Sequence, residues 1–194
     1  MSDQLPEFKR VVTGHNAEGL AIISSAAPTP NVFPLKAMPD TIFHEIWSTT
    51  GTPVKIDNGA DPFALPLKLS PPPLGSRIRV VDIPPDSVQD QISSEGVSAL
   101  FSEIGSRHAT TAHADSKHKI MHRTETVDYG IVIEGEVWLV VDDGEVHCKH
   151  GDIIIQRGTN HAWSNRTEKM ARVIFILLDG RYAEELNNVR GTQP

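Results

Sequence analysis

The sequence predicts an all-β fold, a sandwich or barrel of short strands, from the distribution of its prolines and the spacing of its apolar runs. Thirteen of the fourteen prolines precede residue 86, and the last is Pro194. Because proline cannot donate a ladder hydrogen bond, central strands exclude it, and residues 86–193 are free to form a continuous sheet. Short strand patterns at roughly ten-residue spacing in that region are typical of a sandwich or barrel.

The C-terminal half of the chain alternates strand patterns with turn residues. Asp142-Asp143-Gly144 lies between two apolar runs, which is a hairpin signal. We expect strands over residues 128–133, 136–141, 145–149, 153–156, 161–165 and 171–178. A short helix is expected over residues 181–187.

The N-terminal part is richer in proline, and its strand patterns are shorter. Strands are expected over residues 8–13, 20–24, 41–47, 54–56 and 77–83, with irregular loops at 26–40 and 58–76. Val97, Leu100, Phe101 and Ile104 have helical spacing and form one apolar face. We therefore predict one structural domain, in which an N-terminal extension or arm (1–75) packs on a barrel (76–194).

Composition excludes several classes of function. The formal net charge of −7 disfavours binding to nucleic acid and to anionic membrane surfaces, since both need a basic face. Cys148 is the only cysteine, so an internal disulfide cannot form. We see neither a transmembrane pattern nor a secretory signal, and we expect a cytoplasmic protein.

Two segments carry residues suited to chemistry. Seven of the nine histidines lie between residues 108 and 161, and histidine is both a common metal ligand and an acid–base group. In a strand, His122, Thr124 and Asp128 have the same parity and share one face. His161 follows an apolar run and a glycine turn, and it opens a later strand.

These segments resemble the two motifs of the cupin superfamily over residues 117–178. His122, Asp128 and Gly135 match the spacing of the first motif, and the second is matched by Gly151, Gly158, His161 and Asn165. Four positions depart from the family pattern, and one of them is Ser116, which replaces the leading glycine of the first motif. The first motif reads His-x-Thr…Asp instead of His-x-His…Glu, with Thr124 and Asp128 at the changed positions. Gln156 replaces the proline of the second motif.

The resemblance implies a jelly-roll barrel (a double-stranded β-helix) that forms a homodimer. In such a fold His122, Asp128 and His161 would hold one divalent metal such as Fe, Zn, Mn or Ni, with His118 as a weaker additional ligand. The same three residues could instead perform acid–base chemistry without a metal, because a carboxylate beside two imidazoles can move protons. The sequence leaves both alternatives open.

The resemblance also implies a small-molecule enzyme, a decarboxylase, dehydratase, isomerase or dioxygenase of secondary metabolism. The expected substrate is an organic acid, aromatic or polyketide-like, bound inside the barrel. Thr124 fills a ligand position and is expected to contact it, Arg157 to clamp its negative group, and Trp163, Tyr129 and Gln156 to line its site. The alternative is a cupin that binds a small ligand without catalysis.

Overall fold

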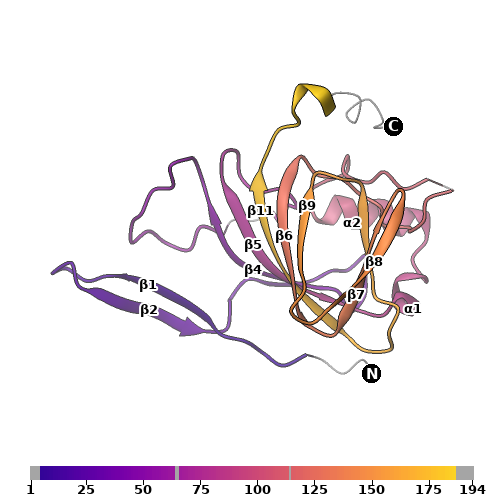
Figure 1. The fold of residues 1–194 in the computed structure, drawn as a ribbon. Coiled ribbons are helices and arrows are strands. Elements are labelled where there is room, and N and C mark those ends of the chain that lie inside the picture. Colours follow the sequence, from indigo (N-terminus) through magenta and orange to yellow (C-terminus); the bar gives the residue numbers. More distant parts are fainter. Residues whose placement is uncertain (1–4, 64–65, 114, 187–194) are drawn as a thin grey trace.

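The computed structural model describes residues 5–63, 66–113 and 115–186, which form an antiparallel two-sheet barrel with an added hairpin (Figure 1). The six-stranded sheet has the order β3 (Val32–Pro34), β4 (Ile42–Thr49), β5 (Ser76–Ile83), β11 (Ala171–Asp179), β6 (Thr126–Glu134) and β9 (Ile153–Arg157). The three-stranded sheet has the order β10 (His161–Ser164), β7 (Glu136–Val141) and β8 (Gly144–Lys149). The all-β barrel prediction is confirmed.

Alternation along the strands determines which side chains face the interior. On β6, Asp128 and Val132 are buried, whereas Tyr129 between them is exposed. On β9, Ile154 and Gln156 are buried between exposed neighbours. Because successive side chains of a strand point to opposite faces, each strand presents every second residue to the interior.

Tight turns connect the strands of the C-terminal half. The predicted hairpin at Asp142-Asp143-Gly144 is confirmed, since β7 ends at Val141 and β8 begins at Gly144. Between β6 and β7, Gly135 has a φ of 66°, and a Cβ there would lie 3.0 Å from the Met170 carbonyl oxygen. Only glycine adopts that conformation without strain in so little space.

The predicted apolar helix is α2 (Ser94–Glu103), which begins earlier than its apolar pattern because Ser93 caps it. The Ser93 hydroxyl accepts a hydrogen bond from the Gly96 amide at 3.2 Å, which satisfies one free donor of the first turn. Leu100 and Phe101 are buried against the barrel. Two short helices flank the barrel, α1 (Asp86–Gln89) and the 3₁₀ turn η1 (Glu184–Leu186). Residue 187 of the predicted C-terminal helix lies outside the described residues.

The N-terminal region differs from its predictions at two places. The expected strand over 54–56 is wrong, because these residues lie in a turn and coil. Part of the expected loop over 26–40 forms β3, which contains Pro34 and pairs only with β4 at the edge of the sheet. Proline is tolerated there because an edge strand leaves donor positions unused.

The strands β1 (Arg10–His15) and β2 (Ala21–Ala27) form a separate hairpin that projects from the barrel (Figure 1). Val11 and Ile23 on this hairpin are exposed. The homodimer stays a prediction. Among the described residues, no helix has the length and apolar character needed to span a membrane.

Asn165, which matches the second motif, is buried directly after β10, and its side chain forms hydrogen bonds with neighbouring segments. Its side-chain amide donates to the carbonyl oxygens of Ile83 at 3.0 Å and Lys169 at 2.8 Å. Its side-chain oxygen accepts hydrogen bonds from the amide and hydroxyl of Thr167. The role of this residue is therefore structural, since it satisfies polar groups that would otherwise be buried without partners.

We predict that Asn165→Ala lowers the free energy of unfolding by about 2–4 kcal/mol, because it leaves two carbonyl oxygens without donors. Urea denaturation followed by circular dichroism measures this. The exposed Glu168→Ala is the matched control, with an expected change within about 0.5 kcal/mol. Equal stabilities of the two variants would contradict the structural role.

Candidate functional site

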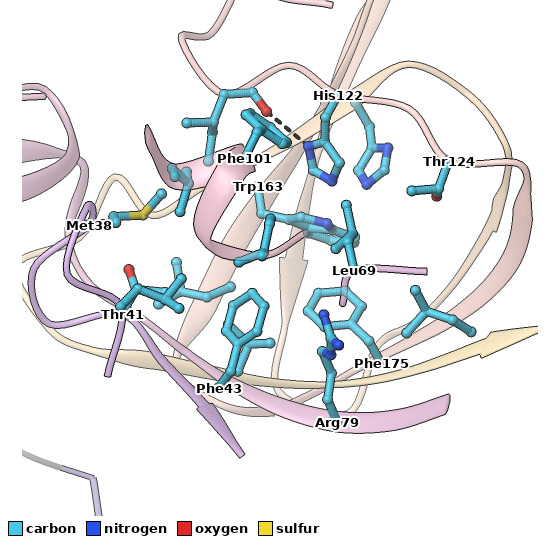
Figure 2. A pocket seen from close by; sticks show the side chains of 18 of the residues that line it. Met38, Thr41, Phe43, Leu69, Arg79, Phe101, His122, Thr124, Trp163 and Phe175 are labelled. Carbon is cyan, nitrogen blue, oxygen red and sulfur yellow. Dashed lines mark hydrogen bonds between the residues drawn. The ribbon is translucent and has the colours of Figure 1, made fainter. Parts of the chain in front are cut away.

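A cavity of about 120 Å³ lies inside the barrel, between the sheets and α2 (Figure 2). Most of its wall is apolar, and Phe43, Phe101, Trp163 and Phe175 supply aromatic rings. The polar side chains that line it come from distant parts of the chain: Thr41, Arg79, Gln89, His122, Thr124, Asp128 and His161. Apolar walls with a few convergent polar groups are typical of a ligand site.

His122 and His161 are brought together by their backbones. The His122 amide donates to the His161 carbonyl oxygen at 2.8 Å, and the His161 amide donates to the His122 carbonyl oxygen at 2.9 Å. Residues that exchange both hydrogen bonds in an antiparallel bridge lie directly opposite, with their side chains on the same face. The centroids of the two imidazole rings are 4.3 Å apart.

Backbone carbonyl groups also fix the protonation of both rings. His122 Nδ1 lies 2.9 Å from the Ile120 carbonyl oxygen, and His161 Nδ1 lies 3.0 Å from the Thr159 carbonyl oxygen. Because a carbonyl oxygen only accepts, Nδ1 of His122 carries the proton of the neutral ring and Nε2 keeps its lone pair. His161 Nδ1 also lies 3.1 Å from the Gln156 Nε2 donor, so the Thr159 carbonyl group favours the same tautomer for His161 without determining it alone. Burial lowers the pKa of His122, and it lowers the pKa of His161 to about 3 with help from the neighbouring His122. Both rings are therefore neutral near pH 7.

The pKa of Asp128 is shifted in the opposite direction to those of the two imidazoles. Burial raises the pKa of Asp128 to about 6, against the lowering effects of the Thr126 hydroxyl and the Arg79 guanidinium. Within the described part of the chain, its Oδ1 has no hydrogen-bond partner. The nearby hydroxyl groups of Thr124 and Thr126 are hydrogen-bonded to each other at 2.7 Å. The carboxyl group is thus held in an apolar environment where it changes protonation close to neutral pH.

The predicted three-ligand metal site is not assembled by the described residues. Among them, no group of three or more His, Cys, Asp or Glu side chains is close enough to hold a metal ion. The two Nε2 lone pairs supply two suitable donors, but the shorter side chain of Asp128 does not join them as a third. His118 is not among the residues that line the cavity, and its Nε2 lies 3.9 Å from an oxygen of Asp86. The donor set therefore does not fit a typical cupin metal.

The structure places the other expected site residues differently. Thr124 and Trp163 line the cavity. Tyr129 and Arg157 are exposed and are not among the residues that line this cavity, so their expected substrate contacts stay predictions. Gln156 is buried behind His161, where its amide donates to the Thr159 carbonyl oxygen at 2.8 Å and so supports the acceptor of the imidazole.

Three cavity residues, Thr41, Arg79 and Gln89, were not expected from the sequence. Arg79 has the parity of Val81 and Ile83 on β5, which is the signal that could have placed it inside. Thr41 begins the strand expected over 41–47 and has the parity of Phe43, so the same signal applies to it. Gln89 ends the short helix α1, where no strand pattern indicates the direction of its side chain.

Comparisons with known proteins agree with this fold. Residues 107–177 match the family described as "Cupin domain". The chain is 31% identical to phomopsin biosynthesis cluster protein C' of Diaporthe leptostromiformis, over 94% of this chain and 84% of that protein. It is 30% identical to the cupin-domain-containing oxidoreductase virC of Hypocrea virens, over 88% and 75% of the two chains. It is 31% identical to the cupin-domain-containing oxidoreductase fogC of Aspergillus ruber, over 90% and 74%.

The raised pKa of Asp128 predicts an unusual effect of pH on stability. Between about pH 4 and pH 6 the folded protein holds this proton and the unfolded chain releases it, so the contribution of Asp128 to stability falls as pH rises. Relative to wild type, Asp128→Asn should therefore gain about 2–3 kcal/mol in unfolding free energy between pH 4 and pH 8.

Urea denaturation of both proteins at the two pH values measures this gain. Asp143→Asn, in the exposed turn between β7 and β8, is the control and should show a difference that does not change with pH. If the difference in unfolding free energy between Asp128→Asn and wild type were also the same at both pH values, the Asp128 carboxyl group would not be desolvated.

Proposed function

This chain belongs to the cupin family, and we propose that it is an enzyme that binds a small organic molecule inside the barrel and transfers a proton to or from it. Its relatives include a biosynthesis cluster protein and cupin-domain-containing oxidoreductases, which supports a role in the biosynthesis of a small molecule. The proposed chemistry is acid–base, and the reaction class is isomerisation, dehydration or decarboxylation.

One observation carries the proposal: Asp128 presents a buried carboxyl oxygen without a hydrogen-bond partner among the described residues, in a cavity whose wall is mostly apolar. Leaving such a group without a partner is costly for folding, and costly polar groups concentrate at functional sites. A pKa of about 6 also suits proton transfer, because an efficient acid or base titrates near the operating pH. Asp128 is thus the proposed general acid or base.

The two imidazoles have a different proposed role. Because burial lowers the pKa of both His122 and His161, these rings are poor proton carriers near neutral pH. Their Nε2 lone pairs are instead suited to accept hydrogen bonds from a hydroxyl or enol group of the substrate. The Thr124 hydroxyl, which also lines the cavity, is a further polar contact for the same end of the molecule.

The size of the cavity limits the substrate. A volume of about 120 Å³ is comparable to an apolar cavity of roughly 150 Å³ that accommodates benzene. The rings of Phe43, Trp163 and Phe175 supply flat walls against which a planar molecule can pack. The proposed substrate therefore has about one ring or a short unsaturated chain.

Ligand binding without turnover is the second candidate function. The predominantly apolar lining favours it, because such a wall retains a ligand without any chemistry. A binding protein would hold its ligand equally well after loss of the Asp128 charge, whereas an enzyme would lose turnover.

The experiment follows carbon-bound hydrogen. Purified protein is incubated in deuterated buffer with a panel of single-ring and short unsaturated acids and ketones, and deuterium uptake is followed by NMR and mass spectrometry. We expect wild type to catalyse exchange beside a carbonyl or carboxyl group, and Asp128→Asn to lose roughly 10²–10⁴-fold in rate. The control Asp143→Asn should match wild type. Exchange that survives in Asp128→Asn, or that is absent in wild type, would contradict the proposal.

A further inference from the structure

Arg79 is a buried cation whose hydrogen-bonding capacity is only partly used. Its side chain is 2% exposed. Its Nη2 donates to the Lys68 carbonyl oxygen at 2.6 Å and lies 2.8 Å from Glu45 Oε1. Among the described residues, its Nε and Nη1 have no hydrogen-bond partner. Three of the five N–H groups of this guanidinium are therefore buried without an acceptor, which is costly unless something else supplies one.

The charges around Arg79 are also unequal. Glu45 is shared, because its other carboxylate oxygen lies 3.1 Å from Nη1 of the buried Arg77. The guanidinium groups of Arg77 and Arg79 thus share the single carboxylate of Glu45. Burial lowers the pKa of Arg79 to about 10, so the group still carries its charge at neutral pH. Asp128 lies on the same sheet, on β6, which β11 separates from β5, and it influences Arg79 without forming an ion pair with it among the described contacts. Arg77, Arg79 and Glu45 together therefore carry one excess positive charge, which Asp128 offsets without contact and an anionic ligand beside Arg79 would balance directly.

The position of Arg79 separates it from the histidines. Figure 2 shows its guanidinium pointing into the cavity from one side, next to Phe43 and Phe175, with His122 on the opposite side. The Arg79 Cζ atom lies 4.7 Å from the centroid of the Phe43 ring. The space between the two polar ends is bordered by aromatic side chains, so the cavity has a cationic end, an apolar middle and an end that accepts hydrogen bonds.

We propose that Arg79 binds a carboxylate group of the substrate, which makes the substrate a small planar carboxylic acid. Its carbon skeleton lies against Phe43, Phe175 and Trp163, and its far end reaches the imidazoles. This inference rests on the proposed function only for the claim that the bound acid then reacts. A carboxylate fits better than a phosphate, because a single partly occupied guanidinium in so small a cavity balances one negative charge.

The test compares two probes of nearly equal shape. Benzoate and benzamide differ mainly in charge, and isothermal titration calorimetry measures the affinity of the whole protein for each. Because the charged probe makes charge-assisted hydrogen bonds with a desolvated guanidinium, we expect wild type to bind benzoate roughly 10–100-fold more tightly than benzamide. Equal affinities, or failure of benzoate to bind at millimolar concentrations, would overturn the inference.

Two arginine variants locate the effect. Arg79→Met should abolish the preference for benzoate, whereas Arg157→Met, at an exposed position at the end of β9, should keep it. If Arg79→Met does not fold, Arg79→Lys is the alternative variant, because it retains the positive charge. Arg79→Lys should keep a reduced preference for benzoate. Loss of the preference in Arg157→Met, or its full retention in Arg79→Met, would place the anion elsewhere.

The same measurements separate this inference from the proposed function. Asp128→Asn should keep or increase the preference for benzoate while it loses hydrogen exchange. A strong preference of wild type for benzoate, without hydrogen exchange in wild type or in any variant, would support the carboxylate site at Arg79 and overturn the proposed proton transfer. Hydrogen exchange of neutral ketones without a preference for benzoate would support the proton transfer and overturn the carboxylate site.

Discussion

The site depends on one pair of backbone hydrogen bonds, the reciprocal bridge between His122 and His161. The bridge joins the segment before β6 to the start of β10, and so ties the two sheets together at the cavity. Since opposed residues in such a bridge share a face, it places both imidazoles on the interior side. The carbonyl groups of Ile120 and Thr159, each two residues away, then orient the rings. The backbone thus positions the site before any ligand is present.

Desolvation is the second constraint, and it disfavours the charged form of every ionisable group whose pKa it shifts in the cavity. It lowers the pKa of both imidazoles, raises that of Asp128 and lowers that of Arg79 without removing its charge. The result is a carboxyl group poised near neutral pH between neutral acceptors and a fixed cation. An arrangement of this kind lowers stability, because buried polar atoms lack partners. A bound ligand that forms hydrogen bonds with those atoms would explain why the protein keeps this loss of stability.

Much of this could be predicted from sequence, because local rules govern it. The spacing of two motifs identified His122, Asp128 and His161, and strand parity placed Asp128 inside. The same parity places Tyr129, its neighbour on β6, on the exposed face, although Tyr129 was expected to line the substrate site.

What the sequence could not predict depends on distant partners. The burial of Arg79 requires Glu45 from β4, which the register of the sheet places directly opposite it. No local pattern shows that pairing, so the sequence pointed to Arg157, which is exposed at the end of β9, and not to the buried Arg79. The metal prediction depends on distant partners in the same way. Ligand spacing in sequence does not determine whether three side chains converge to bonding distance, and here the described residues do not.

The most direct test of the account is the protonation of the two rings, read by ¹⁵N NMR of specifically labelled histidine. We predict that His122 and His161 are both neutral at pH 7, with the proton on Nδ1 and a lone pair on Nε2, and that His161 stays neutral down to about pH 5. An imidazolium signal for either residue at pH 7 or for His161 near pH 5, or a proton on Nε2 of the neutral ring, would contradict the arrangement on which the site is built.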